Sequence, residues 1–131
     1  MECYYLVNTN KTHRPTEERR MLRDNHVSAQ YGPKKNIDVL NQGDIVFLYK
    51  NNVGIIAYGI ADGKLIIGDF EGHEDEQHLM HVDRFRFFTP PIRPSEITKL
   101  SHELASTGIF FARTVSRLHS EVGRSLLRLF K

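Results

Sequence analysis

Three apolar, β-rich segments lie close together in the middle of the chain, and they constrain its fold more than any other feature. They are DIVFLYK (44–50), VGIIAYGIA (53–61) and KLIIG (64–68). The pairs that separate them, Asn51-Asn52 and Asp62-Gly63, are two-residue hairpin signals. We therefore expect a three-stranded meander. Because the segments are nearly continuous rather than alternating in polarity, we expect both of its faces to be covered.

Strand and helix signals alternate on either side of these segments. A strand is predicted over 3–7, and a helix with little apolar content, lying on the surface, over 15–24. An irregular segment (26–33) and a short helical turn (35–40) follow. After the meander we expect an acidic loop (69–76), a strand (78–88) that ends at Thr89-Pro90-Pro91, a helix from Pro94 to Gly108, a strand (114–118) and a final helix capped by Ser120. This order predicts one α+β domain over residues 1–131, a small mixed or antiparallel β-barrel flanked by helices.

Composition excludes several classes of protein. The single cysteine among 131 residues excludes an internal disulfide framework and a cysteine-built zinc site. No segment approaches the roughly 18 consecutive apolar residues of a membrane span, and the N-terminus lacks the pattern of a signal peptide. We therefore expect a cytoplasmic protein with no membrane partner.

The net charge of +2 is unevenly distributed. Lysine and arginine prevail over 11–35 and 113–131, whereas 62–76 is acidic. A folded chain of this kind can present one positive face to an anionic partner. The alternative is that these charges belong to solvated helix faces.

Motifs for catalysis or metal binding are weak. In the predicted strand, His78 and His81 would point to opposite faces, so with His73 they do not form a metal site, and we expect no metal and no cofactor. Cys3 lies in a predicted strand and is expected to be a structural residue. The chain contains no nucleophile elbow, phosphate-binding loop or dinucleotide-binding motif.

Aromatic, amide and hydroxyl residues gather at predicted strand ends, near basic residues. They are Tyr4, Tyr5, Asn8 and Asn10, then Ser28, Gln30 and Tyr31, and then Tyr49 and Asn51 beside Lys50. A flipped or single-stranded base requires a flat aromatic surface, polar groups for its edges and cations for its phosphates. Each of these tyrosines could equally be a core residue; only the combination indicates base binding.

Residues 27–59 also resemble a known family. GDIVFLY (43–49) followed by VGIIA (53–57) is similar to the central strands of EVE domains, which belong to the PUA-like superfamily together with the YTH modified-base readers. VDRFRFFTPPIRPSEITKL (82–100) and GIFFARTVSRLHSEVGRSLL (108–127) resemble later segments of that family, in the same order.

This resemblance implies a non-catalytic module that binds a nucleobase, often a modified one, extruded from DNA or exposed in RNA. The implied pocket residues are Asn8, Thr9, Asn10, Ser28, Ala29, Gln30, Tyr31, Tyr49, Lys50 and Asn51, with phosphate contacts from Lys34, Lys35 and Arg113. YTH readers surround a methyl group with tryptophans, which this chain lacks. That difference favours a pocket of tyrosine stacking and amide hydrogen bonds.

Two alternatives stay open. One is an enzyme acting on RNA or nucleosides, like the related ASCH proteins, for which a Lys–Thr–Glu set is needed; Lys11, Thr12 and Glu17 are the nearest such group in the sequence. The other is a regulatory or interaction subunit of a defence or restriction system, with a recruited effector protein such as a nuclease or ATPase as its partner.

Overall fold

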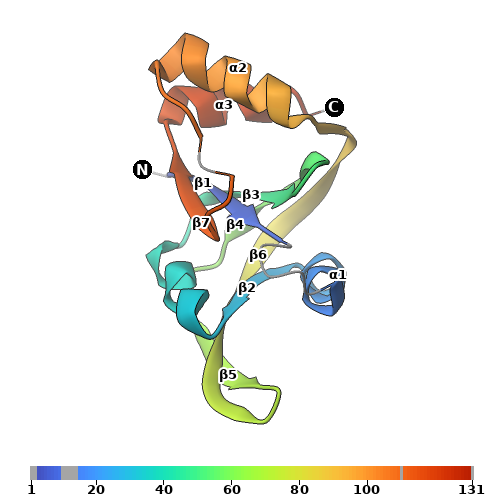
Figure 1. Cartoon of the computed structure of the whole chain (residues 1–131), viewed down its shortest axis with the longest axis vertical. Coiled ribbons are helices and arrows are strands. Elements are labelled where there is room, and N and C mark those ends of the chain that lie inside the picture. The colour runs from blue at the N-terminus through green and yellow to red at the C-terminus, as the bar shows by residue number, and fades with distance from the viewer. Residues whose placement is uncertain (1–2, 10–14, 110, 131) are drawn as a thin grey trace.

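A curled, mixed sheet of seven strands organises this computed structural model, which describes residues 3–9, 15–109 and 111–130 (Figure 1). The strands are β1 (Tyr4–Asn8), β2 (His26–Gln30), β3 (Ile45–Lys50), β4 (Gly54–Ala61), β5 (Ile66–Phe70), β6 (His73–Ile92) and β7 (Val115–Leu118). The helices are α1 (Pro15–Asp24), the 3₁₀ helix η1 (Gly32–Val39), α2 (Pro94–Ala105) and α3 (Ser120–Arg128). Helices α2 and α3 lie together at one end of the molecule, and β5 lies at the opposite end (Figure 1). The predicted fold class, an α+β curled barrel-like sheet flanked by helices, is confirmed.

Strand order is β2-β6-β4-β3-β1-β7, and β5 pairs with β6 outside this path. The pair β1–β3 is parallel and places Asn8 beside Tyr49, whereas the other pairs are antiparallel. Strand β6 is 20 residues long. Its first half pairs with β2 and β5 and its second half with β4, which joins the two parts of the sheet.

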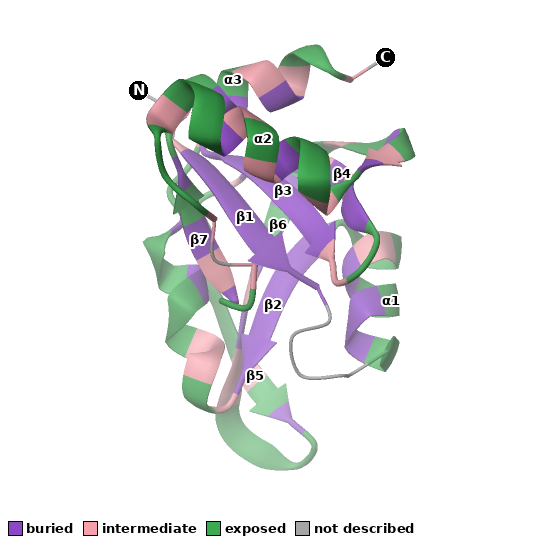
Figure 2. Ribbon diagram, turned by 45° about the horizontal axis from the view of Figure 1, so that its top comes forward, coloured by how far each residue is buried: buried purple, intermediate pink, exposed green. Residues whose placement is uncertain are grey.

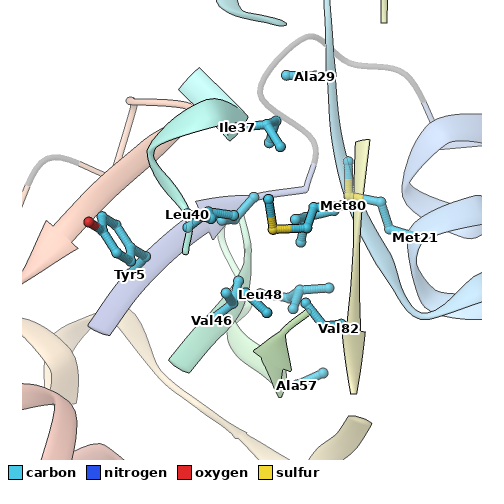
Figure 3. Packing of buried hydrophobic residues seen from close by; sticks show 13 residues of the cluster. Tyr5, Met21, Ala29, Ile37, Leu40, Val46, Leu48, Ala57, Met80 and Val82 are labelled. Carbon is cyan, nitrogen blue, oxygen red and sulfur yellow. The ribbon is translucent and has the colours of Figure 1, made fainter. Parts of the chain in front are cut away.

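Two apolar clusters lie on opposite faces of β1, because side chains alternate along a strand. Tyr5 and Val7 belong to one cluster, which Met21 of α1 and Ile37 of η1 cover (Figure 3). Tyr4 and Leu6 belong to the other, which lies under α2 and α3. Central strands β1 and β3 are accordingly buried almost along their whole length (Figure 2).

The predicted three-stranded meander is wrong in its second half. Strands β3 and β4 form the expected hairpin, but β5 pairs with β6 instead of β4. The backbone N–H of Asp62 donates to the His81 carbonyl oxygen at 3.0 Å, so the chain leaves β4 along β6 and does not turn back. As a result β5 is an edge strand, with Ile66 46% and Ile67 52% exposed, and not a covered one.

Other boundaries also differ from the sequence predictions. Residues 26–30, expected to be irregular, form β2, and β6 continues through Pro90-Pro91 to Ile92. Helix α1 has the expected bounds, but it buries Glu17, Glu18 and Met21 instead of lying on the surface. His119, rather than Ser120, caps α3: its Nδ1 accepts the backbone N–H of Glu121 at 3.2 Å. Within the described residues, no helix has the length and apolar character needed to cross a bilayer.

Candidate functional site

Parallel pairing brings the carboxyl ends of β1 and β3 together at one end of the sheet. Five of the residues proposed for the base pocket meet there, and we call them the β1–β3 cluster: Asn8, Thr9, Tyr49, Lys50 and Asn51. The side-chain Nδ2 of Asn8 donates to Asn51 Oδ1 at 3.0 Å and to the Phe111 carbonyl oxygen at 2.8 Å. These two hydrogen bonds connect β1 to the β3–β4 turn and to the segment before β7.

Glu18 of α1 adds a buried carboxylate to the β1–β3 cluster. Its Oε2 accepts a hydrogen bond from Thr9 Oγ1 at 3.0 Å, and its Oε1 lies 3.2 Å from Lys50 Nζ. The Glu18 side chain is 11% exposed and that of Lys50 is 42% exposed. A hydroxyl, a carboxylate and an ammonium group are therefore in direct contact, and the ammonium faces solvent.

An aromatic pair forms the other side of this site. The rings of Tyr49 and Phe111 stack with their centroids 4.6 Å apart and an interplanar angle of 15°. Tyr49 is buried, and burial raises the pKa of its phenol above the ordinary value of 10, so the hydroxyl stays neutral at physiological pH. Phe111 is only half-buried. It is the member of the pair that retains exposed surface.

Four of the remaining proposed pocket residues belong to a second group at β2. Ser28 and Gln30 are buried and bonded to each other, with Gln30 Nε2 donating to Ser28 Oγ at 3.2 Å, and Ala29 lies in the apolar core. The Tyr31 ring contacts the Phe70 ring edge-on, with centroids 5.5 Å apart, and the Tyr31 hydroxyl donates to Glu71 Oε1 at 2.7 Å. Tyr31 thus lies against the β5–β6 hairpin, whereas Tyr49 lies at the end of β3.

The proposed phosphate contacts are spread over different elements. Lys34 Nζ pairs with Glu76 at 3.1 Å, and Lys35 is exposed. Arg113 lines a hollow between α2, β7 and α3. Asn10 lies outside the described residues.

Of the Lys–Thr–Glu set named from the sequence, the structure describes only Glu17. Lys11 and Thr12 lie outside the described residues, and Glu17 pairs with Arg20 at 3.4 Å. Among the described residues, Thr9, Glu18 and Lys50 form a set of the same three residue types.

Sequence reasoning missed Glu18 and Phe111. Both are neighbours of the β1–β3 cluster through contacts between residues far apart in the sequence. An acid in the first turn of a helix, such as Glu18, is ordinarily explained by its favourable interaction with the helix N-terminus. Its position three residues before Met21, which covers the core, was the available signal that the same face of α1 points inward.

The histidines that a metal site would need have separate neighbours. His78 Nδ1 is 2.6 Å from Asp38 Oδ1, the His81 ring contacts His26, and the His73 ring contacts Tyr31. In the described part of the chain, no three histidine, cysteine or acidic side chains are placed to hold a metal ion.

Comparison with known proteins identifies the fold. No protein-family model and no curated protein matches the chain. Among solved structures, a tyrosine-to-phenylalanine variant of an ASCH protein from Zymomonas mobilis is 10% identical with a TM-score of 0.67, covering 99% of this chain and 100% of that one. Another structure of ASCH from that organism is 9% identical with a TM-score of 0.62, covering 98% and 96%. A hypothetical protein from Leishmania major is 12% identical with a TM-score of 0.66, covering 98% and 94%.

These likenesses support the PUA-like part of the resemblance found in the sequence. The neighbours whose names give a domain type are ASCH proteins, so they do not support an EVE domain in particular. At such low identity, the likeness concerns the fold alone. The chain has the PUA-like fold seen in ASCH proteins.

Proposed function

We propose that this chain is a cytoplasmic nucleic-acid-binding module that holds a nucleobase, of the kind EVE-type domains bind, at the β1–β3 cluster. The observation that carries the proposal is the gathering of Asn8, Asn51 and Lys50 beside a half-buried aromatic ring at one end of the sheet. Residues from β1, β3, α1 and the segment before β7 converge there, which makes it a built site rather than a single exposed side chain.

Amide groups supply the polar contacts. An asparagine side chain offers a donor and an acceptor in one plane, which matches the edge of a base. The Asn8 amide is 3% exposed and fixed by two hydrogen bonds, so it orients Asn51 at the rim. Lys50 adds a positive charge at the same rim. These groups recognise a base edge and attract the negatively charged strand that carries it.

Phe111 supplies the stacking surface. One face of its ring packs on Tyr49, which holds the ring in place, and we assign the exposed part to the base. Stacking on an aromatic side chain contributes about 1–3 kcal/mol per base, or about ten- to a hundredfold in Kd.

The test measures fluorescence anisotropy with short labelled RNA and DNA oligonucleotides that carry plain or modified bases. We expect Phe111→Ala to weaken binding of the preferred oligonucleotide about ten- to a hundredfold. Asn51→Ala, which removes an amide from the rim, is expected to weaken it about threefold to tenfold.

Tyr31→Ala is the matched control, because Tyr31 is also an implied pocket residue but lies in the other group, at β2. If Tyr31→Ala abolishes binding and Phe111→Ala does not, the base binds at β2 and the placement at the β1–β3 cluster is wrong. If no oligonucleotide in the panel binds, the proposed function itself is wrong.

A second function, hydrolysis of RNA or of a nucleoside derivative, is favoured by one observation: the contact between Thr9, Glu18 and Lys50. A carboxylate in this position can accept a proton from an attacking water, and an ammonium can stabilise the negative charge that develops on the substrate oxygen. In this hypothesis Glu18 is the general base, and Lys50 stabilises the negative charge on the substrate.

Glu18→Gln and Lys50→Met separate the two functions. Both variants are expected to abolish turnover of RNA or of acylated nucleosides if the site is catalytic. If the parent protein binds an oligonucleotide and leaves it intact, while Phe111→Ala loses the binding, hydrolysis is excluded for that substrate and the binding function stands.

A further inference from the structure

A polar hollow between η1 and β7 is separate from the β1–β3 cluster, and we call it the η1–β7 hollow. Its volume is about 290 Å³, and it is lined by Tyr5, Asn36, Val39, Val115 and Arg117. Tyr5 and Asn8 both lie on β1, but a strand rises about 3.3 Å per residue, so the two residues are about 10 Å apart along it.

Strand register explains why Tyr5, Val115 and Arg117 share this hollow. In the antiparallel pair of β1 and β7, Tyr5 lies directly opposite Arg117, and Val7 lies opposite Val115. Residues directly opposite each other point to the same face of a sheet, as do residues two apart along a strand. This face is the one that η1 covers, because Tyr5 belongs to the same apolar cluster as Ile37.

Three polar side chains line the hollow: the phenol of Tyr5, the amide of Asn36 and the guanidinium of Arg117. In the described part of the chain, none of the three has a hydrogen-bond or ion-pair partner. Tyr5 is only 8% exposed, and Figure 3 shows its hydroxyl oxygen pointing away from the other labelled core side chains. A buried hydroxyl without a protein partner is uncommon, and this one borders a hollow that a ligand can enter.

Arg117 gives the hollow its positive charge, and Tyr5 adds a neutral donor. Burial, and then the charges of Asp44 and Cys3, raise the pKa of the Tyr5 phenol above its ordinary value of 10, although Arg117 lowers it. The phenol is therefore protonated at physiological pH, and its O–H is available to donate a hydrogen bond.

Two acids lie on segments next to the hollow, and both have partners. Asp44 accepts the backbone N–H groups of Cys3 and Asn41, at 3.0 and 2.9 Å. Asp38 Oδ1 of η1 lies 2.6 Å from His78 Nδ1. Among the described residues that line the hollow there is no carboxylate, so none is placed there to pair with Arg117.

These features fit a carboxylate attached to a small apolar group. A guanidinium binds a carboxylate through paired, charge-assisted hydrogen bonds. One arginine balances the single charge of a carboxylate, whereas a phosphate monoester carries about −1.5 to −2 at pH 7 and would also be repelled by the nearby Asp44. Val39 and Val115 supply apolar surface beside the polar groups. The volume lies just below the range of about 300–1,000 Å³ for drug-sized ligands, so the ligand is small.

We propose that the η1–β7 hollow binds a small organic monocarboxylate, with its carboxylate at Arg117 and the Tyr5 hydroxyl and its apolar part against Val39 and Val115. Asn36 completes the polar contacts from η1. This inference goes beyond the proposed function and does not rest on it, because none of these residues belongs to the β1–β3 cluster.

Heteronuclear NMR titration with benzoate and hexanoate tests the proposal, since it detects weak binding and locates it. We expect both probes to shift the backbone amide signals of Asn36, Val39 and Val115. Arg117→Gln, at an exposed position where the variant is expected to fold, should weaken benzoate binding at least tenfold. Benzamide, which has the same ring without the charge, and acetate, which lacks the apolar part, should each bind at least tenfold more weakly than benzoate.

Tyr5→Phe removes only the hydroxyl and keeps the ring in the core. It is expected to weaken benzoate binding about threefold to tenfold. Because the hydroxyl has no partner among the described residues, the free energy of unfolding of the ligand-free variant is expected to be unchanged or higher. A less stable Tyr5→Phe protein with unchanged benzoate affinity would show that the hydroxyl is structural and would remove it from the site.

Arg128→Gln on α3 is the matched control, because it removes the same charge from an exposed position that does not line the hollow. Its affinity for benzoate is expected to equal that of the parent. An equal loss in Arg128→Gln and Arg117→Gln would mean that the overall charge of the protein attracts the probe, and it would overturn the proposal. The proposal also fails if neither probe shifts the signals of the hollow, or if phenyl phosphate binds there more tightly than benzoate.

Discussion

Replacing Gly123 by alanine tests how α3 is fixed to the sheet. Gly123 is buried in α3, and a Cβ at this position would lie 2.1 Å from Cγ and 2.4 Å from Cδ1 of Tyr4. Non-bonded carbon atoms prefer separations of about 3.5–4.0 Å. The Tyr4 ring is 4% exposed and stacks on Phe47 with centroids 6.5 Å apart, so it cannot move into solvent.

Two effects of Gly123→Ala oppose each other. Alanine favours a helix over glycine by about 1 kcal/mol. Overpacking a well-filled core costs about 1–3 kcal/mol, and contacts this short with a confined ring place the cost at the upper end. We therefore expect the free energy of unfolding to fall by about 1–2 kcal/mol, with a decrease in Tm on the order of 5 °C.

Urea denaturation followed by circular dichroism measures this change. Ser125→Ala in the same helix is the control; it changes helix propensity at a half-buried position and is expected to be neutral or slightly stabilising. In a Tyr4→Ala background, which removes the Cγ and Cδ1 atoms that the added Cβ would meet, Gly123→Ala is expected to be less harmful. A Gly123→Ala protein at least as stable as the parent would show that α3 does not pack on Tyr4 as described.

Two further predictions concern pH and packing. Burial, and then the charge of His81, lower the pKa of His26 from 6.5 to about 4; Asp24 nearby raises it, and Arg20 and Arg23 lower it slightly. Since unfolded His26 takes up a proton below pH 6.5 and folded His26 does not until about pH 4, stability is expected to fall by about 1–3 kcal/mol as pH decreases through that range. His26→Gln is expected to flatten this part of a plot of unfolding free energy against pH, and an unchanged plot would contradict the assignment. Ile97→Ala, at a fully buried position, is expected to lower the free energy of unfolding in urea by about 2–5 kcal/mol. Ile67→Ala, at a position that is 52% exposed, is expected to lower it by less than about 0.5 kcal/mol. Similar losses for the two variants would show that β5 is covered.

Local signals in the sequence located most elements but not all their partners. Pro15 and Pro94 mark the first residues of α1 and α2, and the hairpin β3–β4 turns at Asn51-Asn52. Residues 26–30 were predicted to be irregular although polar His26, Ser28 and Gln30 alternate with Val27 and Ala29, which is the pattern of a strand. The alternation covers only five residues and includes one β-branched residue, so composition alone does not indicate a strand there.

Pairing between distant segments was the harder part of the fold. Asp62-Gly63 has the composition of a tight hairpin turn, yet hydrogen bonds from this region reach β6 instead. A local turn preference is a small free-energy term, and the pairing of β5 with β6 outweighs it by extending an existing sheet. Composition of the turn carries no information about that competition.

The residues of the candidate site could also be predicted only in part. Asn8, Tyr49, Lys50 and Asn51 were foreseeable because aromatic, amide and basic residues gather at the ends of two predicted strands, and Thr9 because of the family resemblance. Phe111 was not, since its stacking on Tyr49 depends on where the segment before β7 crosses the sheet. The structure therefore adds to the foreseen amides the acid and the aromatic ring that complete the site.

Topology explains why these groups meet. In a parallel pair both carboxyl ends lie at the same edge, so β1 and β3 deliver Asn8 and Asn51 to one place. Strand β7 is antiparallel to β1, so it must begin where β1 ends, and the segment before it arrives at that same edge with Phe111 and Arg113. Any change that shifts this segment must therefore disturb both the stacking of Phe111 on Tyr49 and the hydrogen bond that holds the Asn8 side chain. Phe111→Ala removes a side chain and leaves the backbone contacts of Asn8 intact, and it is for that reason the variant that tests the proposed stacking surface alone.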